Sequence, residues 1–173
     1  FASAINTLAS LDIINTQTNM FYPDNYLRHY DFVMIFVNSL LSFKTQSLAN
    51  VSTSSFADVE STALYLPQLT YASDRWLIDY IVMSKRGQLY FQPNEFMTKH
   101  EVYQILSKTL NIQFSYNVQQ ADTQKITRAE MAQIIVESFW LQRKISQSES
   151  TIQDISDEEV TLLNTLKVLL SMI

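Results

Sequence analysis

The sequence contains no cysteine and only one glycine, Gly87, among its 173 residues. The absence of cysteine excludes disulfide bonds and thiol catalysis, but it does not identify the compartment. The single glycine excludes the glycine-rich phosphate loops of P-loop NTPases and of dinucleotide-binding proteins. Turns must therefore be formed largely by Asn, Asp, Ser and Pro.

Charge and long apolar runs are also scarce. Charged residues make up 17% of the chain and apolar residues 47%, which indicates a globular protein. The net charge of −5 argues against a nucleic-acid partner. The longest strictly apolar run covers residues 32–37, far below the roughly 20 residues of a membrane span, so we expect no membrane insertion. Because the chain has neither an initiator Met nor a signal peptide at Phe1, we expect it to be part of a longer protein.

Helical spacing of apolar residues runs through nearly the whole sequence. It predicts six helices, around residues 4–11, 30–41, 76–82, 102–110, 131–139 and 160–170. The segment "QLYFQ" at 88–92 alternates like a strand, but it is too short to form a sheet alone. The sequence therefore predicts an all-α fold.

Three of the expected helices begin in a similar way. Residues 21–33 read "FYPDNYLRHYDFV" and residues 91–103 read "FQPNEFMTKHEVY", and both begin with Phe-x-Pro. Residues 126–132 read "ITRAEMA" and are not preceded by Phe-x-Pro. Aligned, the helix starts are residues 28–31, 98–101 and 127–130, which indicates internal repeats.

Capping explains most of the repeated start. Thr98 with Glu101, and Thr127 with Glu130, each fit the Thr-x-x-Glu capping box. In that motif the threonine hydroxyl accepts from the third helical amide and the glutamate accepts from the amide of the threonine. Each cap should contribute about 1 kcal/mol.

Capping does not explain the basic residue that follows each cap position. These residues are His29, Lys99 and Arg128, and a cation there opposes the helix macrodipole. Each could form a salt bridge to an acidic neighbour, or point into solvent. Alternatively, the free amides of the helix start together with the basic side chain could bind an anion.

The same segments resemble the S-layer homology (SLH) repeat of bacterial cell-surface proteins. "FADV" (56–59), "RWLIDYI" (75–81), "FQP" (91–93) and "MTKHE" (97–101) follow the order of that repeat, and "ITRAE" (126–130) is its most specific element. The family's glycine-rich turn is replaced by "NTQTNM" (15–20) and "SKRGQL" (84–89).

The resemblance implies one domain, residues 1–173, made of three helix–loop–helix repeats in a pseudo-threefold arrangement. The repeats cover residues 1–50, 51–114 and 115–173. The third is split, because its "ITRAE" helix precedes "IQDISDEEVTLLNTLKVLLSMI" (152–173), which looks like a first helix. Either the repeats close by a permuted pairing, or the last segment starts a further repeat that is cut off.

The resemblance also implies a function at the bacterial cell wall or S-layer, outside the cell. SLH domains anchor larger proteins without covalent bonds to cell-wall polysaccharides, including pyruvylated ones. By this similarity Arg128 would meet the acidic group of the glycan, with Lys99 and His29 at the equivalent sites. Trp76 could offer a stacking surface for a sugar, although a tryptophan in the core is the simpler interpretation.

Two departures leave a second function open. Lys99 cannot fork onto a carboxylate as arginine does, and His29 would be mostly neutral at pH 7. The alternative is an assembly domain that makes protein–protein contacts with neighbouring subunits of a surface layer or filament. We expect no enzyme activity, no cofactor and no metal, because the sequence shows no nucleophile elbow and no metal-ligand spacing.

Overall fold

The computed structural model describes residues 1–14, 21–44, 48–49, 51–114, 121 and 123–140. The chain divides into two compact units, Phe1–Ser138 and Phe139–Ile173, and only residues 139–140 of the second are described. The helix expected at 160–170 therefore lies outside the described residues. The single domain over 1–173 with its three repeats stays a prediction.

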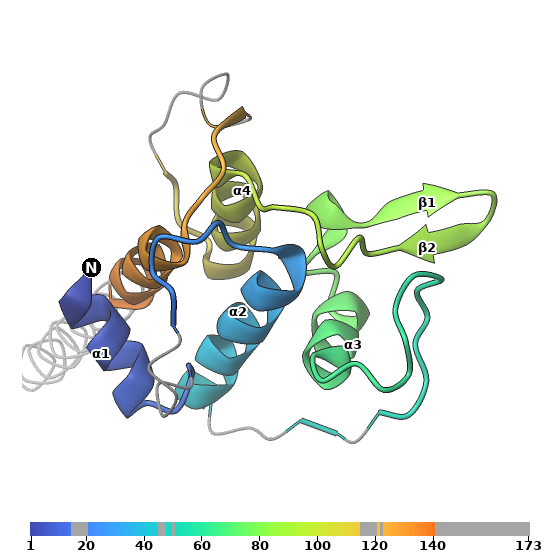
Figure 1. The fold of residues 1–173 in the computed structure, drawn as a ribbon, viewed down its shortest axis with the longest axis horizontal. Helices are drawn as coiled ribbons and strands as arrows, with labels where there is room; N and C mark the ends of the chain where they lie inside the picture. The colour runs from blue at the N-terminus through green and yellow to red at the C-terminus, as the bar shows by residue number, and fades with distance from the viewer. Residues whose placement is uncertain (15–20, 45–47, 50, 115–120, 122, 141–173) are drawn as a thin grey trace, which may run out of the picture. The chain divides into compact units, whose positions relative to one another are not determined.

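Four of the expected helices are confirmed. The structure has α1 (Ala2–Ser10), α2 (His29–Lys44), α4 (Lys99–Leu110) and a helix over residues 128–140. Their apolar stripes are buried, as Leu8, Phe36, Ile105 and Ile135 show. In Figure 1, α1 lies on one side of α2 and α3 (Leu66–Asp74) on the other.

The prediction of a helix around Trp76 is wrong. Helix α3 ends at Asp74, and Trp76 follows with a left-handed backbone (φ 57°) that no α-helix tolerates. A short 3-10 helix, η1 (Asp79–Ile81), comes next. The apolar residues that suggested a helix lie in the turn at Trp76 and in or directly beside η1, before the strand begins. Pro67 lies in the first turn of α3, where proline is common, and so marks the start of a helix that the spacing of apolar residues did not predict.

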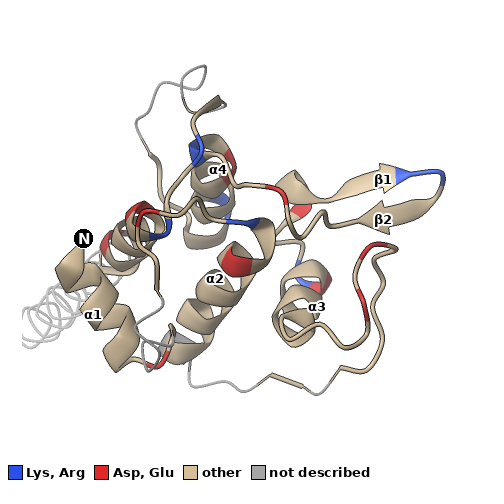
Figure 2. Cartoon of the chain, in the orientation of Figure 1, with Lys and Arg blue, Asp and Glu red and all other residues tan. Residues whose placement is uncertain are grey.

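The all-α prediction is also wrong, because the protein contains an antiparallel sheet and is a mixed α/β structure. Strand β1 (Met83–Lys85) pairs with β2 (Gln88–Tyr90), with Ser84 opposite Leu89. Arg86 and Gly87 form the two-residue turn, and both have positive φ, as a type I′ hairpin requires. Arg86 and the neighbouring Lys85 mark the tip of the hairpin in Figure 2. The first three residues of "QLYFQ" form a strand because residues 83–85 supply its partner.

The hairpin is tied to the segment before α3. The backbone amide of Ala57 donates to the carbonyl of Leu89 at 2.8 Å. The carboxylate of Asp58 accepts from the backbone amides of Phe91 and Gln92, at 2.9 and 2.7 Å. Asp58 thus links the "FADV" segment (56–59) to the Phe-x-Pro segment (91–93), although Phe91 follows Asp58 by 33 positions.

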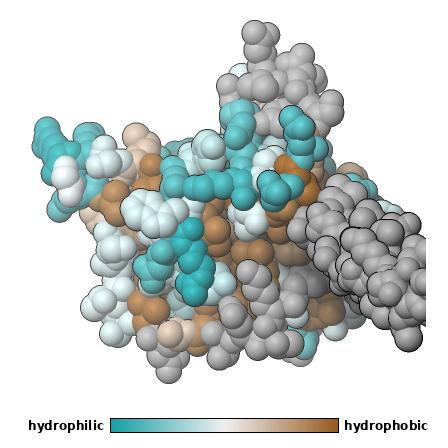
Figure 3. Space-filling view, turned by 180° about the vertical axis from the view of Figure 1, so that it is seen from behind, coloured by the Kyte–Doolittle hydropathy of each residue, from teal (hydrophilic) through white to brown (hydrophobic). Residues whose placement is uncertain are grey.

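The core lies between the helices. Its largest fully buried side chains include Phe32, Phe91, Leu69 and Met97. Seen from behind, hydrophobic residues show in the middle of the described surface, below hydrophilic residues (Figure 3). None of the helices in the described part of the chain combines the length and apolar character needed to cross a membrane.

Candidate functional site

The three repeated helix starts meet in a closed ring of backbone hydrogen bonds. The amide of Leu27 donates to the carbonyl of Ile126, that of Ile126 to Met97, and that of Met97 to Leu27, over 2.9 to 3.1 Å. These residues directly precede the three cap positions, and all three side chains are fully buried. The ring therefore fixes the three helix starts against one another and anchors each of them in the core.

A second set of hydrogen bonds repeats the pattern two residues further along each segment. The first helical amide of each start donates to the preceding segment of another at 2.9 Å: His29 to Glu95, Lys99 to Gln124, and Arg128 to Asn25. These amides are ones that a helix leaves unpaired. In the described structure they are occupied by protein, so they are not an open anion site at the base of the ring.

Both predicted capping boxes are confirmed. The amide of Glu101 donates to the Thr98 hydroxyl at 3.3 Å and the amide of Thr98 donates to the Glu101 carboxylate at 2.8 Å. The corresponding distances for Thr127 and Glu130 are 3.2 and 2.9 Å. Local sequence therefore specifies where these two helices begin.

Arg128 is committed to two partners in its own protein. Its guanidinium forms an ion pair with Asp31, the acidic residue in the first turn of α2, and Nε donates to the carbonyl of Phe21 at 2.8 Å. The exposed fractions of the Arg128 and Asp31 side chains are 21% and 16%. The guanidinium of Arg128 therefore joins two helix starts. Of the alternatives given by the sequence for this residue, the structure shows the salt bridge to an acidic neighbour.

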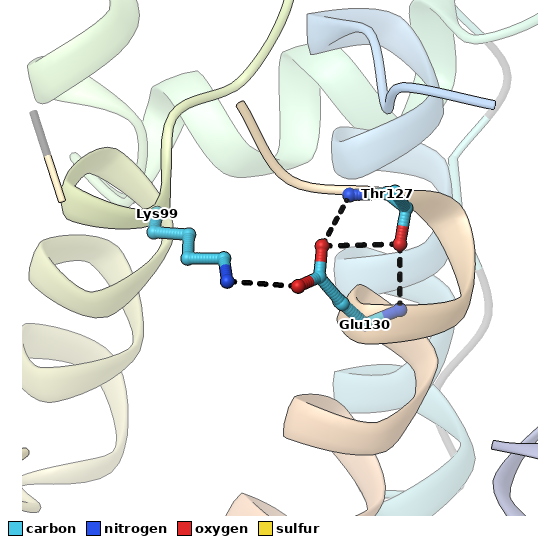
Figure 4. Close-up of polar contacts among 3 residues, drawn as sticks. All are labelled: Lys99, Thr127 and Glu130. Atoms are coloured by element: carbon cyan, nitrogen blue, oxygen red, sulfur yellow. Dashed lines mark hydrogen bonds and ion pairs between the residues drawn. The ribbon is translucent and has the colours of Figure 1, made fainter. Parts of the chain in front are cut away.

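Lys99 repeats one half of that arrangement (Figure 4). Its ammonium lies 2.8 Å from the carboxylate of Glu130, the acidic residue of the next helix start, and 19% of the Lys99 side chain is exposed. Burial alone would raise the pKa of Glu130, but hydrogen bonds from Lys99 and Thr127 outweigh it. The pKa of Glu130 consequently lies below its ordinary value.

His29 repeats the other half. Its Nδ1 lies 3.0 Å from the carbonyl of Phe91, the counterpart of Phe21, and the residue is only 5% exposed. The three basic residues of the repeats thus occupy equivalent places. Arg128 binds both a backbone carbonyl and a carboxylate, whereas Lys99 binds a carboxylate and His29 binds a backbone carbonyl. All three hold helix starts together, and little of their surface faces solvent.

The exposed side of the ring carries an aromatic and basic cluster. Tyr26, Phe96 and Lys125 occupy equivalent positions, one residue before the buried ring. The rings of Tyr26 and Phe96 meet edge to face at 5.8 Å. The ammonium of Lys125 lies 4.5 Å from the centre of the Phe96 ring and 5.7 Å from that of Tyr26. Arg28 lies over Phe96 at 4.9 Å.

An open groove of about 710 Å³ begins at this cluster. Its wall includes Tyr26, Lys125 and Thr127 together with the carboxylates of Asp24 and Glu130. Tyr26 is 51% exposed, so its ring is accessible beside the Lys125 cation. The capping and helix patterns of the sequence do not point to Tyr26 or Lys125. Extending the alignment of the repeats by two residues before each cap would have placed both at the position of Phe96.

Trp76 lies outside this groove. It is 71% exposed, so the interpretation as a core tryptophan is wrong. It lines a separate groove of about 570 Å³ with Ser73, Asp74, Asp79 and Leu89. The structure thus brings Arg128, Lys99 and His29 together around one ring and places Trp76 in another surface feature.

Within the part of the chain that the structure describes, no group of three or more His, Asp or Glu side chains is arranged to hold a metal ion. No protein-family model matches the chain, and no curated protein matches it in sequence. The similarity to the SLH repeat therefore rests on the motifs alone.

Proposed function

We propose that the protein is a non-catalytic cell-surface module that anchors a larger protein to an acidic cell-wall polysaccharide. The observation that carries the proposal is the groove beside the helix starts, where an exposed aromatic ring lies next to a cation and hydrogen-bonding side chains. An aromatic face packs against the C–H face of a sugar, and polar groups at its edge orient the hydroxyls.

In this proposal the basic residues of the ring and those of the groove have different tasks. Arg128, Lys99 and His29 fix the helix starts through contacts with protein groups. Lys125 lies at the groove wall, so it meets the carboxylate of the glycan. Tyr26 stacks on the sugar ring. Arg128 and Lys99 therefore act on binding through the position of the groove wall.

Sedimentation with purified cell-wall sacculi, before and after removal of the acidic polymer, tests this assignment. Wild type sediments only while the polymer is present. Lys125→Ala and Tyr26→Ala each weaken binding about tenfold, the effect of losing one contact of about 1.4 kcal/mol. Tyr26→Phe keeps the ring and most of the affinity. Lys85→Ala at the hairpin tip removes the same charge outside the groove, and it should bind like wild type.

Equal sedimentation of wild type and Lys125→Ala would overturn the proposal. So would sedimentation that does not depend on the acidic polymer. A different result would be a wild-type protein that fails to sediment with sacculi and forms oligomers at micromolar concentration, which analytical ultracentrifugation measures. That result would favour the assembly domain in a surface layer or filament.

A further inference from the structure

The β1–β2 hairpin, residues 83–90, is an arm with solvent on both of its faces. It extends away from the helices (Figure 1), and every residue from 83 to 89 is exposed. Met83 and Leu89 point to opposite sides of the sheet and are 52% and 38% exposed, so each face carries an open apolar side chain. A two-stranded hairpin is only marginally stable in water, so this arm would gain stability from a further strand.

The backbone of β1 is open along its outer edge. Lys85 and Gln88 close the two-residue turn, and hydrogen-bonded pairs alternate from there, so Ser84 faces Leu89 in a non-hydrogen-bonded pair. Both residues consequently turn their amides and carbonyls away from the hairpin. The carbonyl of Leu89 accepts from the amide of Ala57 at 2.8 Å, which covers the β2 edge. No strand or bridge among the described residues pairs with the edge at Ser84.

The groove of about 570 Å³ at the base of the arm offers an exposed carboxylate. Asp79 is paired with Lys108 at 2.9 Å. Asp74 is exposed, and the neighbouring cation, Arg75, lies over a tyrosine ring of α3 at 3.8 Å. Val82, the residue before β1, lines the same groove as Asp74. The base of the arm therefore presents a negative charge, in contrast to its basic tip.

A second copy of the chain fits the arm with its charges matched. Two β1 strands related by a two-fold axis pair antiparallel, and the open groups of Ser84 in one copy then face those of Ser84 in the other. This register places Arg86 of one copy opposite Val82 of the other, beside the groove that contains Asp74. A register shifted by two residues toward the tip would set Lys85 against Lys85, which is unfavourable. Charge therefore favours the register centred on Ser84.

We propose that the arm is a self-association site, where two copies of the chain pair their β1 strands across a two-fold axis to form one continuous antiparallel sheet. Arg86 of each copy then meets Asp74 of the other. The paired strands are only three residues long, so the dimer is weak, with a Kd of about 10–100 μM. The site shares no residue with the groove at Tyr26, so it does not depend on glycan binding.

Sedimentation velocity over a range of about 5 to 500 μM measures the dimer. Ser84→Pro removes the outward amide from each copy and keeps the pairing with β2, which does not use that amide. This variant should stay monomeric throughout the range and melt at the wild-type temperature. Lys85→Ala is the matched control, because the charge of Lys85 meets no acidic group in this register, and it should dimerise as wild type does.

A charge exchange between two variants tests the two-fold arrangement itself. Arg86→Glu and Asp74→Lys should each raise the Kd at least tenfold, because a two-fold interface repeats every change at two contacts. An equimolar mixture of the two variants should associate again, since each new charge then faces its opposite in the other chain. A folding defect in either variant would not produce this recovery.

Wild type that stays monomeric at the highest concentration would overturn the proposal. A dimer that Ser84→Pro leaves unchanged would place the contact elsewhere on the chain, and a charge-exchange mixture that stays monomeric would refute the pairing of Arg86 with Asp74. A monomeric wild type that binds a poly-glutamate peptide, with loss of that binding in Arg86→Glu, would assign the arm to an acidic partner instead of a second copy.

Discussion

Arg128→Ala should destabilise the protein by about 3 kcal/mol. The substitution removes an ion-paired hydrogen bond to Asp31, about 2 kcal/mol, and the bond from Nε to the carbonyl of Phe21, about 1 kcal/mol. It also leaves the Asp31 carboxylate, which is 16% exposed, without its partner. Relief of the unfavourable macrodipole contact returns only a few tenths of a kcal/mol.

Arg128→Lys separates the two contacts. A lysine ammonium cannot fork, so it keeps either the carboxylate or the carbonyl, and the expected loss is about 1–2 kcal/mol. The double-mutant cycle with Asp31→Asn isolates the ion pair, for which we expect a coupling energy of about 1–2 kcal/mol.

Urea denaturation at pH 7, followed by far-UV circular dichroism, measures each free energy of unfolding. Lys85→Ala at the hairpin tip is the matched control and should change stability by less than about 0.5 kcal/mol. A coupling energy near zero, or an Arg128→Ala variant as stable as wild type, would refute the assignment of Arg128 to the ring.

Two further predictions concern other carboxylates. Because the folded state holds the pKa of Glu130 below its ordinary value of 4.5, its ionised form stabilises the protein above that pH, and this contribution disappears as the pH falls through the lower folded value. The difference in urea midpoint between wild type and Glu130→Gln should therefore shrink between pH 6 and pH 3, and a constant difference would contradict it. Asp58→Ala removes both acceptors of the Phe91 and Gln92 amides and should cost about 2 kcal/mol in thermal denaturation, whereas Asp58→Asn, which keeps one acceptor oxygen, should lose about half. Equal losses in the two Asp58 variants would rule out this bonding.

Local patterns predicted local structure well. The capping boxes of Thr98 and Thr127 depend on residues three positions apart, and both helices begin where the boxes place them. The apolar spacing around Ile105 and Ile135 was sufficient to locate the helices because those faces are buried in the core. The capping contacts lie three residues apart, and the apolar spacing marks the buried face of a helix whichever part of the chain covers it.

Non-local pairing was not predictable from the same patterns. The strand at 88–90 depends on a partner at 83–85 and on the positive φ of Arg86 and Gly87. The spacing of apolar residues around Trp76 is typical of a helix, but the left-handed backbone of Trp76 itself excludes one there. For the candidate site, the sequence identified the three basic positions and not their partners. Asp31 precedes Arg128 by 97 residues, so only the folded chain brings them together.

An NMR titration of isotope-labelled protein with a pyruvylated wall oligosaccharide tests the proposed anchoring most directly. We expect saturable shifts of the backbone amides at Tyr26 and residues 124–127, with little change at the hairpin tip around Gly87. The methyl ester of the same ligand, which lacks the negative charge, should bind about tenfold more weakly. Absent shifts, or shifts that spare residues 124–127, would contradict a glycan site at the ring.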